Sequence, residues 1–180
     1  VWQGYGGGVY ITGGTVTVTG CSIYSNTGSN GVGMFISGGT VTTMESLIYL
    51  NTASNGPAGV RIQDGITTFT SCEFYQNTAE VYAGGLYAYR GSLILRSNTF
   101  VDNKANQEGA CALNIFPDVS AAGSELFNNT FRSGSVACPT KTMVLVQITT
   151  GFKCSALGEW MSPTPFSSPI DTFSGCRFKC

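Results

Sequence analysis

The sequence predicts an all-β fold, a right-handed parallel β-helix of about five coils with 25–26 residues each. Three observations carry this prediction: a gapless internal repeat, short stretches in which apolar and polar residues alternate, and glycines at fixed positions between those stretches. A fixed-period repeat is typical of solenoids, in which each repeat buries its inner face only by stacking on its neighbours.

The repeat is clearest in four tetrads that begin with an apolar residue and end with asparagine. They are Ile23–Asn26, Ile48–Asn51, Phe74–Asn77 and Phe100–Asn103. Fourteen positions before each tetrad stands an apolar residue that follows a glycine, and nine positions before it stands a second glycine. These glycine columns are Gly8, Gly33, Gly59 and Gly85, and Gly14, Gly39, Gly65 and Gly91. Three columns that keep one register four times indicate one coil per repeat.

Each coil contains three short stretches that alternate in the manner of strands, such as Val9/Ile11, Val16/Val18 and Ile23. The fifth repeat ends with Phe131 and carries extra residues at 117–123, which predict a loop. A further strand is expected at 143–148. We therefore expect a β-helix over residues 1–148 and a cysteine-rich tail over 149–180, which either caps the last coil or begins a separate module.

The columns predict separate structural roles. The glycines suit corners that need a positive φ or close backbone approach. The asparagines suit a stacked amide ladder, in which each side chain bonds the next coil; the alternative is four independent turn residues. The ladder residues are Asn26, Asn51, Asn77 and Asn103.

The composition excludes several partners. Only 11% of the residues are charged and the net charge is −1, so no basic face is available for nucleic acid. No apolar run reaches the roughly 20 residues of a membrane-spanning helix. The chain begins with Val1 rather than Met, which suggests that an upstream segment was removed.

The cysteines indicate an oxidising environment. Seven cysteines occur without any His and without a CxxC pair, so no zinc site, other metal or cofactor is expected. Disulfides favour a secreted or cell-surface location, or another oxidising lumen. The candidate pairs are Cys111 with Cys138, and Cys154 with Cys176 or Cys180. An odd count leaves one thiol free or bonded to another chain.

The glycine and asparagine motifs resemble those of a known family. Gly7-Gly8-Val9 and Gly84-Gly85-Leu86, with Phe74–Asn77 and Phe100–Asn103, are similar to the GG-apolar and FxxN repeats of the polymorphic outer membrane proteins. The resemblance covers about Gly4 to Phe131 and implies adhesion or assembly rather than catalysis. The tail, with Gly158-Glu159-Trp160-Met161, is similar to secreted β-helix proteins of unicellular algae.

Parallel β-helices also include polysaccharide lyases and hydrolases, which need clustered acids. In the four clean coils no two acidic residues share a column in adjacent coils, and Asp64 stacks instead against Arg90, as in a surface ion pair. No His can act as a base, so we expect no catalytic residue. A carbohydrate-active enzyme remains the alternative, because irregular loops can bring distant acids together.

A second alternative is ice binding by a threonine face on the second strands. The face is interrupted at Met44, Ile66, Ile94 and Arg96, and threonine is favoured in strands without any function.

The candidate binding surface is an outward column on the first strands: Tyr10, Phe35, Arg61 and Tyr87. Stacked aromatic residues suit a sugar platform or a protein interface, but a loop could equally cover them. A second column, Tyr24, Tyr49 and Tyr75, is expected to pack along a corner. Asn128 begins an N-glycosylation triplet. The sequence thus predicts a non-catalytic structural or binding scaffold, either an adhesive module or a peripheral subunit of a larger assembly, with other proteins or surface glycans as partners.

Overall fold

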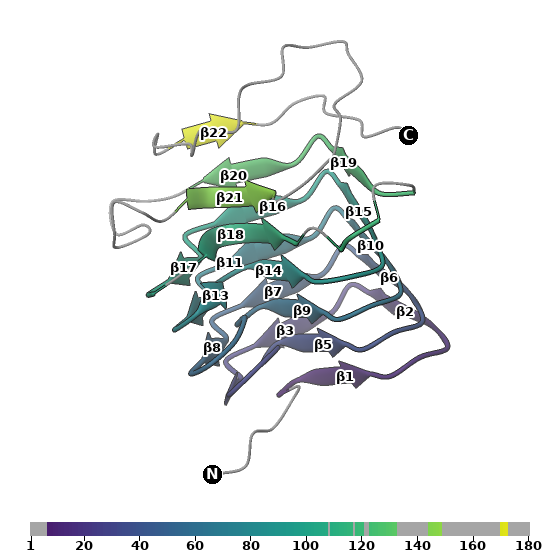
Figure 1. Ribbon diagram of the computed structural model, residues 1–180, viewed down its shortest axis with the longest axis horizontal. Coiled ribbons are helices and arrows are strands. Elements are labelled where there is room, and N and C mark those ends of the chain that lie inside the picture. Colours follow the sequence, from purple (N-terminus) through teal and green to yellow (C-terminus); the bar gives the residue numbers. More distant parts are fainter. Residues whose placement is uncertain are drawn as a thin grey trace.

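A computed structural model describes residues 7–107, 109–116, 118–120 and 123–132, and two strands at 144–148 and 170–172. The described residues contain strands and turns and no helix. The chain winds into stacked coils, so that strands from successive coils lie side by side as parallel rungs from the N-terminal end to the C-terminal end (Figure 1). This architecture, an all-β parallel solenoid, confirms the predicted fold class.

Successive coils contribute strands to four sheets. Sheet 1 contains β1 (Val9–Ile11), β5 (Met34–Ile36), β9 (Val60–Ile62), β14 (Leu86–Ala88) and β18 (Gly109–Ile115), with β13 (Tyr82–Ala83) and β21 (Val144–Ile148) also paired to β18. Sheet 2 contains β2 (Thr15–Thr19), β6 (Thr40–Met44), β10 (Ile66–Thr70), β15 (Ser92–Arg96) and β19 (Glu125–Phe127).

Sheet 3 contains β3 (Ser22–Tyr24), β7 (Leu47–Tyr49), β11 (Glu73–Tyr75), β16 (Thr99–Val101) and β20 (Thr130–Arg132). Sheet 4 contains β4 (Thr27–Gly28), β8 (Thr52–Ala53), β12 (Thr78–Ala79) and β17 (Lys104–Ala105). The sequence pattern predicted three strands per coil and missed sheet 4. Its strands are two residues long, which is too short for alternation to be visible.

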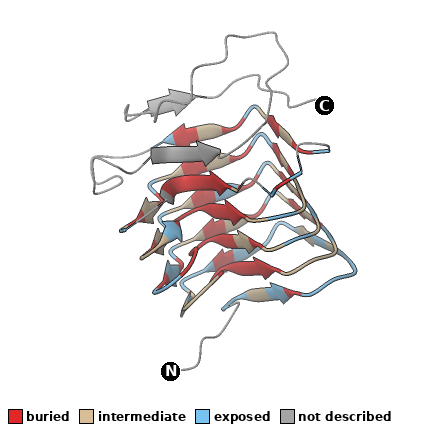
Figure 2. Cartoon of the chain, viewed as in Figure 1, coloured by how far each residue is buried: buried red, intermediate tan, exposed pale blue. Residues whose placement is uncertain are grey.

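The register places like residues on like residues. Ile23, Ile48, Phe74, Phe100 and Phe131 are paired in that order along sheet 3. The Phe74 and Phe100 rings are stacked with centroids 4.4 Å apart, and the Phe100 and Phe131 rings are 4.9 Å apart. All three rings are buried in one core that runs along the axis, visible as the buried strands in Figure 2. Stacked aromatic rings therefore fill the centre of the last three coils.

The four ladder asparagines do hydrogen-bond from coil to coil. The Nδ2 of Asn26, Asn51 and Asn77 each donates to the Oδ1 of the next asparagine, up to Asn103, at 2.9 Å. The same Oδ1 atoms accept the backbone N–H of the preceding asparagine at 3.1–3.2 Å. The ladder thereby satisfies backbone groups at a corner where the strand hydrogen bonds are interrupted.

A second ladder lies at the corner between sheets 2 and 3, and the sequence pattern did not single it out. Asn98 donates from Nδ2 to Asn129 Oδ1 at 3.0 Å, and Cys72 N–H donates to Asn98 Oδ1 at 2.9 Å. In the coil before Cys72, this corner position is held by Ser46, whose hydroxyl accepts a hydrogen bond from the Cys21 N–H at 3.1 Å. Because Cys, Ser and Asn share this column, it has no single-residue signature.

At both corners the residue before the ladder residue adopts a left-handed conformation, as in Leu50, Gln76 and Ser97 with φ of 53°, 52° and 54°. Asn128 has φ of 52° at the same corner position and is exposed, whereas its neighbour Asn129 is buried in the ladder. The ladder hydrogen bonds offset the cost of these conformations.

The two glycine columns have different roles. Gly14, Gly39, Gly65 and Gly91 have φ between 80° and 98°. The other column, which runs from Gly8 to Gly85, is needed for close approach: a Cβ on Gly8 would lie 2.7 Å from the carbonyl oxygen of Gly33. Both roles that the sequence suggested for glycine therefore occur, one in each column.

The core of sheet 2 contains a threonine whose hydroxyl has no hydrogen-bond partner in the described part of the structure. Thr67 is fully buried, and its Oγ1 is unpaired. We expect Thr67→Val to raise the free energy of unfolding by about 1 kcal/mol, because the isosteric change removes a buried unsatisfied hydroxyl. Urea denaturation of Thr67→Val should be compared with Thr68→Val, a half-buried neighbour on the outer face, for which the change should stay within about 0.5 kcal/mol. A loss of stability in Thr67→Val would show that the hydroxyl has a partner.

Within the tail, the structure describes one short strand. β22 (Ile170–Thr172) pairs antiparallel with β20 at the end of sheet 3. The remaining predictions for 149–180 lie outside the described residues, as do Cys138, Cys154, Cys176 and Cys180. Cys111 is buried, and Cys21 and Cys72 are free thiols, one exposed and one buried. Burial raises the pKa of the Cys72 thiol and keeps it protonated at neutral pH.

Candidate binding groove on sheet 1

The predicted column on the outer face of sheet 1 is in register: Tyr10 pairs with Phe35, Phe35 with Arg61 and Arg61 with Tyr87. It is not a flat exposed platform: of the two alternatives left open by the sequence, the covered column holds for Phe35 and Tyr87. Phe35 is 5% exposed and Tyr87 6%, whereas Tyr10 is 54% exposed. The backbone at Gly31, which precedes β5, packs against the Phe35 ring, because that ring occupies the space beside Gly31.

Two residues of the column, Arg61 and Tyr87, line a groove of about 450 Å³. Its lining residues are Asn30, Asn55, Arg61, Tyr82, Tyr87, Tyr89 and Phe116. Of these, the sequence analysis named Arg61 and Tyr87. Asn30 and Asn55 hold the same position in two consecutive repeats, four residues after Asn26 and Asn51, a signal that the sequence analysis did not use. Tyr82 lies in β13, and Tyr89 and Phe116 directly follow β14 and β18, where no repeated residue type marks them.

Arg61 lies at the centre of the polar contacts in this groove. Its Nη1 donates to Asn30 Oδ1, and its Nη2 donates to Gln63 Oε1 at 3.0 Å. The guanidinium carbon is 5.4 Å from the Phe35 ring centroid and 5.9 Å from that of Tyr87. These contacts fix the guanidinium plane between two aromatic rings, an arrangement that favours a cation.

The charge of Arg61 is not neutralised within the described part of the chain. The ion pairs found there join Arg90 to Asp118 and Arg96 to Glu125. The Nε of Arg61 is buried and has no hydrogen-bond partner among the described residues. A fixed, uncompensated cation in a groove attracts anions.

Asn30 is held in place by a small neighbour. Its side-chain amide occupies the space that a Cβ on Gly56 would need. A larger residue at position 56 would displace Asn30 and with it the acceptor that orients Arg61. Gly56 therefore positions the site although it lies outside both glycine columns.

Tyr82 has a strained backbone. Its φ is 74°, and it is the one non-glycine residue with positive φ in the described part of the chain that lies outside the two ladder corners. The Tyr82 side chain is 39% exposed, and its ring centroid is 5.3 Å from that of Tyr87. Strain of this kind persists where the surroundings enforce it and is common at binding sites.

Aromatic contacts continue along the groove. Phe116 lies between Tyr87 and Tyr89, with ring centroids at 5.6 Å and 5.5 Å. Burial raises the pKa of Tyr87 to about 12, against a smaller opposing effect of Arg61. The Tyr87 hydroxyl therefore remains a hydrogen-bond donor throughout the physiological range.

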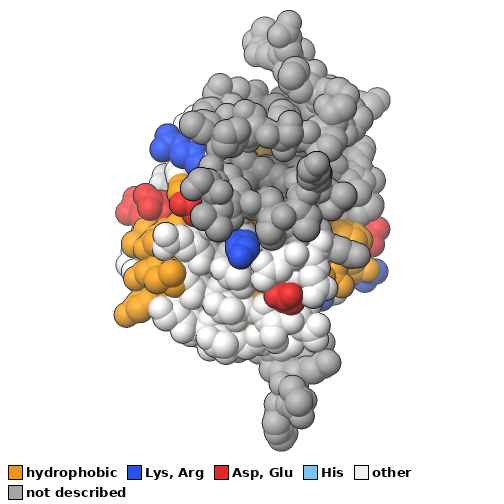
Figure 3. All heavy atoms as spheres, turned by 90° about the vertical axis from the view of Figure 1, so that its left-hand side faces the viewer, with side chains coloured by type: hydrophobic (Ala, Val, Ile, Leu, Met, Phe, Trp, Pro, Cys, Tyr) orange, Lys and Arg blue, Asp and Glu red, His pale blue; other side chains and the backbone are white. Residues whose placement is uncertain are grey.

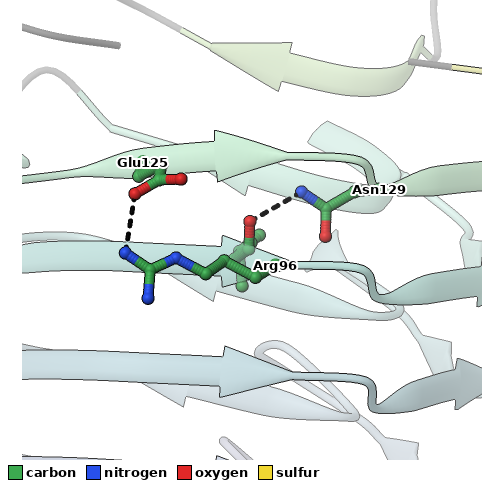
Figure 4. Close-up of polar contacts among 4 residues, drawn as sticks. Arg96, Glu125 and Asn129 are labelled. Carbon is green, nitrogen blue, oxygen red and sulfur yellow. Dashed lines mark hydrogen bonds and ion pairs between the residues drawn. The ribbon is translucent and has the colours of Figure 1, made fainter. Parts of the chain in front are cut away.

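Among the described residues, no carboxylate lines the groove. Asp64 accepts a hydrogen bond from the N–H of Gly65 at 2.7 Å, and the expected pair with Arg90 is not formed because Arg90 lies 3.6 Å from Asp118. The Glu80 carboxylate accepts hydrogen bonds from the side-chain amides of Asn106 and Gln107, and these bonds lower its pKa. Glu125 is 2.8 Å from Arg96 on the outer face of sheet 2 (Figure 4). The same figure shows the buried Asn129 of the second ladder, whose Nδ2 donates to the carbonyl oxygen of Leu95 at 2.9 Å.

Seen from the side of sheet 4, the described surface is largely uncharged between two flanks where hydrophobic side chains gather (Figure 3). Among the described residues no group of three or more His, Cys, Asp or Glu could hold a metal ion. The arrangement in the groove suits binding through rings, amides and one cation.

A family model described as the right-handed beta helix region matches residues 6–138, more than half of the chain. The chain belongs to the right-handed β-helix family. No curated protein and no solved structure matches it at a significant level. Right-handed β-helices include enzymes as well as non-enzymes, so the function of this β-helix has to be argued from its groove.

The described part of the chain contains no α-helix that is long and apolar enough to cross a membrane.

Proposed function

We propose that the protein is a non-catalytic, adhesive binding scaffold that holds a surface glycan in the groove on sheet 1. The observation that carries the proposal is the convergence of Tyr82, Tyr87, Tyr89 and Phe116 with Arg61 and two asparagines in one depression. Sugar rings present apolar faces that pack on aromatic rings and hydroxyls that pair with amide and guanidinium groups.

The rigidity of the groove supports binding. Arg61 is fixed by Asn30 and Gln63, and the Tyr87 ring contacts both Tyr82 and Phe116. Side chains that are already ordered lose little conformational entropy when a ligand binds. A repeat scaffold of stacked coils provides this rigidity along its whole length.

A lyase or hydrolase is disfavoured because glycoside cleavage needs an acid and a base at the bound sugar. Among the residues that the structure describes, the groove lining contains no carboxylate. An ice-binding surface on sheet 2 is disfavoured because Ile66 follows Thr40 in the same column, and Met44 follows Thr19. We place the protein in a secreted, cell-surface or other oxidising location, in keeping with its cysteines.

Replacing Tyr82 with alanine is expected to weaken glycan binding about tenfold, because it removes the most exposed ring of the groove. The wild-type protein and the variant should be applied to an array of immobilised oligosaccharides, followed by calorimetry on the sugars that are retained. Tyr24→Ala is the matched control, since Tyr24 is an exposed tyrosine on sheet 3 that does not line the groove.

Equal binding by Tyr82→Ala and the wild-type protein would place the glycan elsewhere, and retention of no oligosaccharide would contradict the proposal. Mass spectrometry of the retained sugars provides a further test. Shortened or unsaturated products, generated by the wild-type protein and not by a boiled sample, would show that the protein is an enzyme.

A further inference from the structure

We infer that the groove selects an anionic sugar, one carrying a carboxylate or a sulfate ester, through the guanidinium of Arg61. The inference rests on the proposed function and adds the chemical class of the ligand. A groove that bound only neutral sugars would have no need of an uncompensated cation.

Arg61 has N–H donors that the described residues do not use. A guanidinium has five N–H donors, and two are used by Asn30 and Gln63. Both partners are neutral amides, so they orient the group without neutralising it. Because the structure pairs Arg61 with no carboxylate among the described residues, the remaining charge is available to a ligand.

The surroundings strengthen this preference. The Phe35 and Tyr87 rings shield the guanidinium from water, and charge-assisted hydrogen bonds are stronger where water is partly excluded. The planar fork of arginine also matches the two oxygens of a carboxylate or sulfate. None of the described carboxylates lines the groove to repel such a ligand.

The test compares probes that differ only in charge. Tetragalacturonic acid and its methyl ester have the same sugar backbone, and a sulfated galactan tetrasaccharide provides the second kind of anion. By calorimetry at low salt, the wild-type protein is expected to bind the acid about tenfold more tightly than the ester. Added salt should weaken binding of the acid and leave binding of the ester unchanged.

Arg61→Gln should bring the acid-to-ester ratio close to one, and Arg61→Lys should keep a smaller preference for the acid. Arg96→Gln is the control, because it removes the same charge from the outer face of sheet 2 and should keep the wild-type ratio. Circular dichroism confirms that each variant is folded. Comparison of the galacturonate with the sulfated probe shows which anion fits better.

A ratio near one in the wild-type protein, an unchanged ratio in Arg61→Gln, or failure to bind either anionic probe would overturn the inference. The proposed function would survive if neutral glycans were still bound and were lost in Tyr82→Ala. It would fail as well if no glycan of any charge were retained.

Discussion

Phe100→Ala is expected to lower the free energy of unfolding by about 3–5 kcal/mol, the range for truncating a buried aromatic residue. Phe100 is fully buried, and its ring stacks on those of Phe74 and Phe131, with centroid distances of 4.4 Å and 4.9 Å. Truncation would leave a cavity between two rings that the strands hold at a fixed spacing, so neither ring can move in to fill it. Phe74→Ala should have a similar effect, since the Phe74 ring also packs edge-on against the Phe69 ring, with centroids 5.3 Å apart.

Chemical denaturation monitored by circular dichroism provides the measurement. Tyr75→Ala is the matched control, because Tyr75 follows Phe74 in β11 but lies on the outer face and stacks on Tyr49 at 4.5 Å. Its loss should cost about 1 kcal/mol. Near-zero changes for both phenylalanine variants would mean that the rings do not fill the axis of the solenoid.

Asn77→Ala is expected to have the other large effect, a loss of roughly 3–5 kcal/mol, because several buried hydrogen bonds are lost together. Asn77 Nδ2 donates to Ile48 O at 2.8 Å and to Asn103 Oδ1 at 2.9 Å. Its Oδ1 accepts from the backbone N–H and the Nδ2 of Asn51. Alanine would leave the Asn51 N–H and the Ile48 carbonyl buried without these partners.

Asn26 at the open end of the ladder provides the comparison. It is half-buried, and among the described residues its side chain donates to Asn51 alone. Asn26→Ala should therefore cost about 1 kcal/mol. Hydrogen exchange of the Asn51 amide should increase in Asn77→Ala and not in Asn26→Ala. Equal losses in the two variants would contradict a cooperative ladder.

The stacked part of the fold was predictable because stacking repeats one environment. The position of Phe74 on Phe100, and of Asn51 on Asn77, follows from their spacing of 26 residues. Sheet 4 and the second ladder were not predictable. The strands of sheet 4 are two residues long, and the second corner accepts Ser, Cys or Asn as hydrogen-bond partners.

The candidate site was predictable only in part, for a related reason. Arg61 and Tyr87 lie on strands, so their register was visible in the sequence. Tyr82 begins the two-residue strand β13 with a strained backbone, and Phe116 directly follows β18, at a position set by its packing against Tyr87. The same packing buries Tyr87, and this burial cannot be read from the outward position of Tyr87 in the repeat.

The central claim is that the groove on sheet 1 is the binding surface. Nuclear magnetic resonance of protein with labelled tyrosine rings, titrated with tetragalacturonic acid, tests it most directly, because the two tyrosine groups lie on different sheets. The account predicts that the ring signals of Tyr82, Tyr87 and Tyr89 shift, while those of Tyr24, Tyr49 and Tyr75 stay unchanged. Shifts in the Tyr24, Tyr49 and Tyr75 signals without shifts in the groove would contradict it.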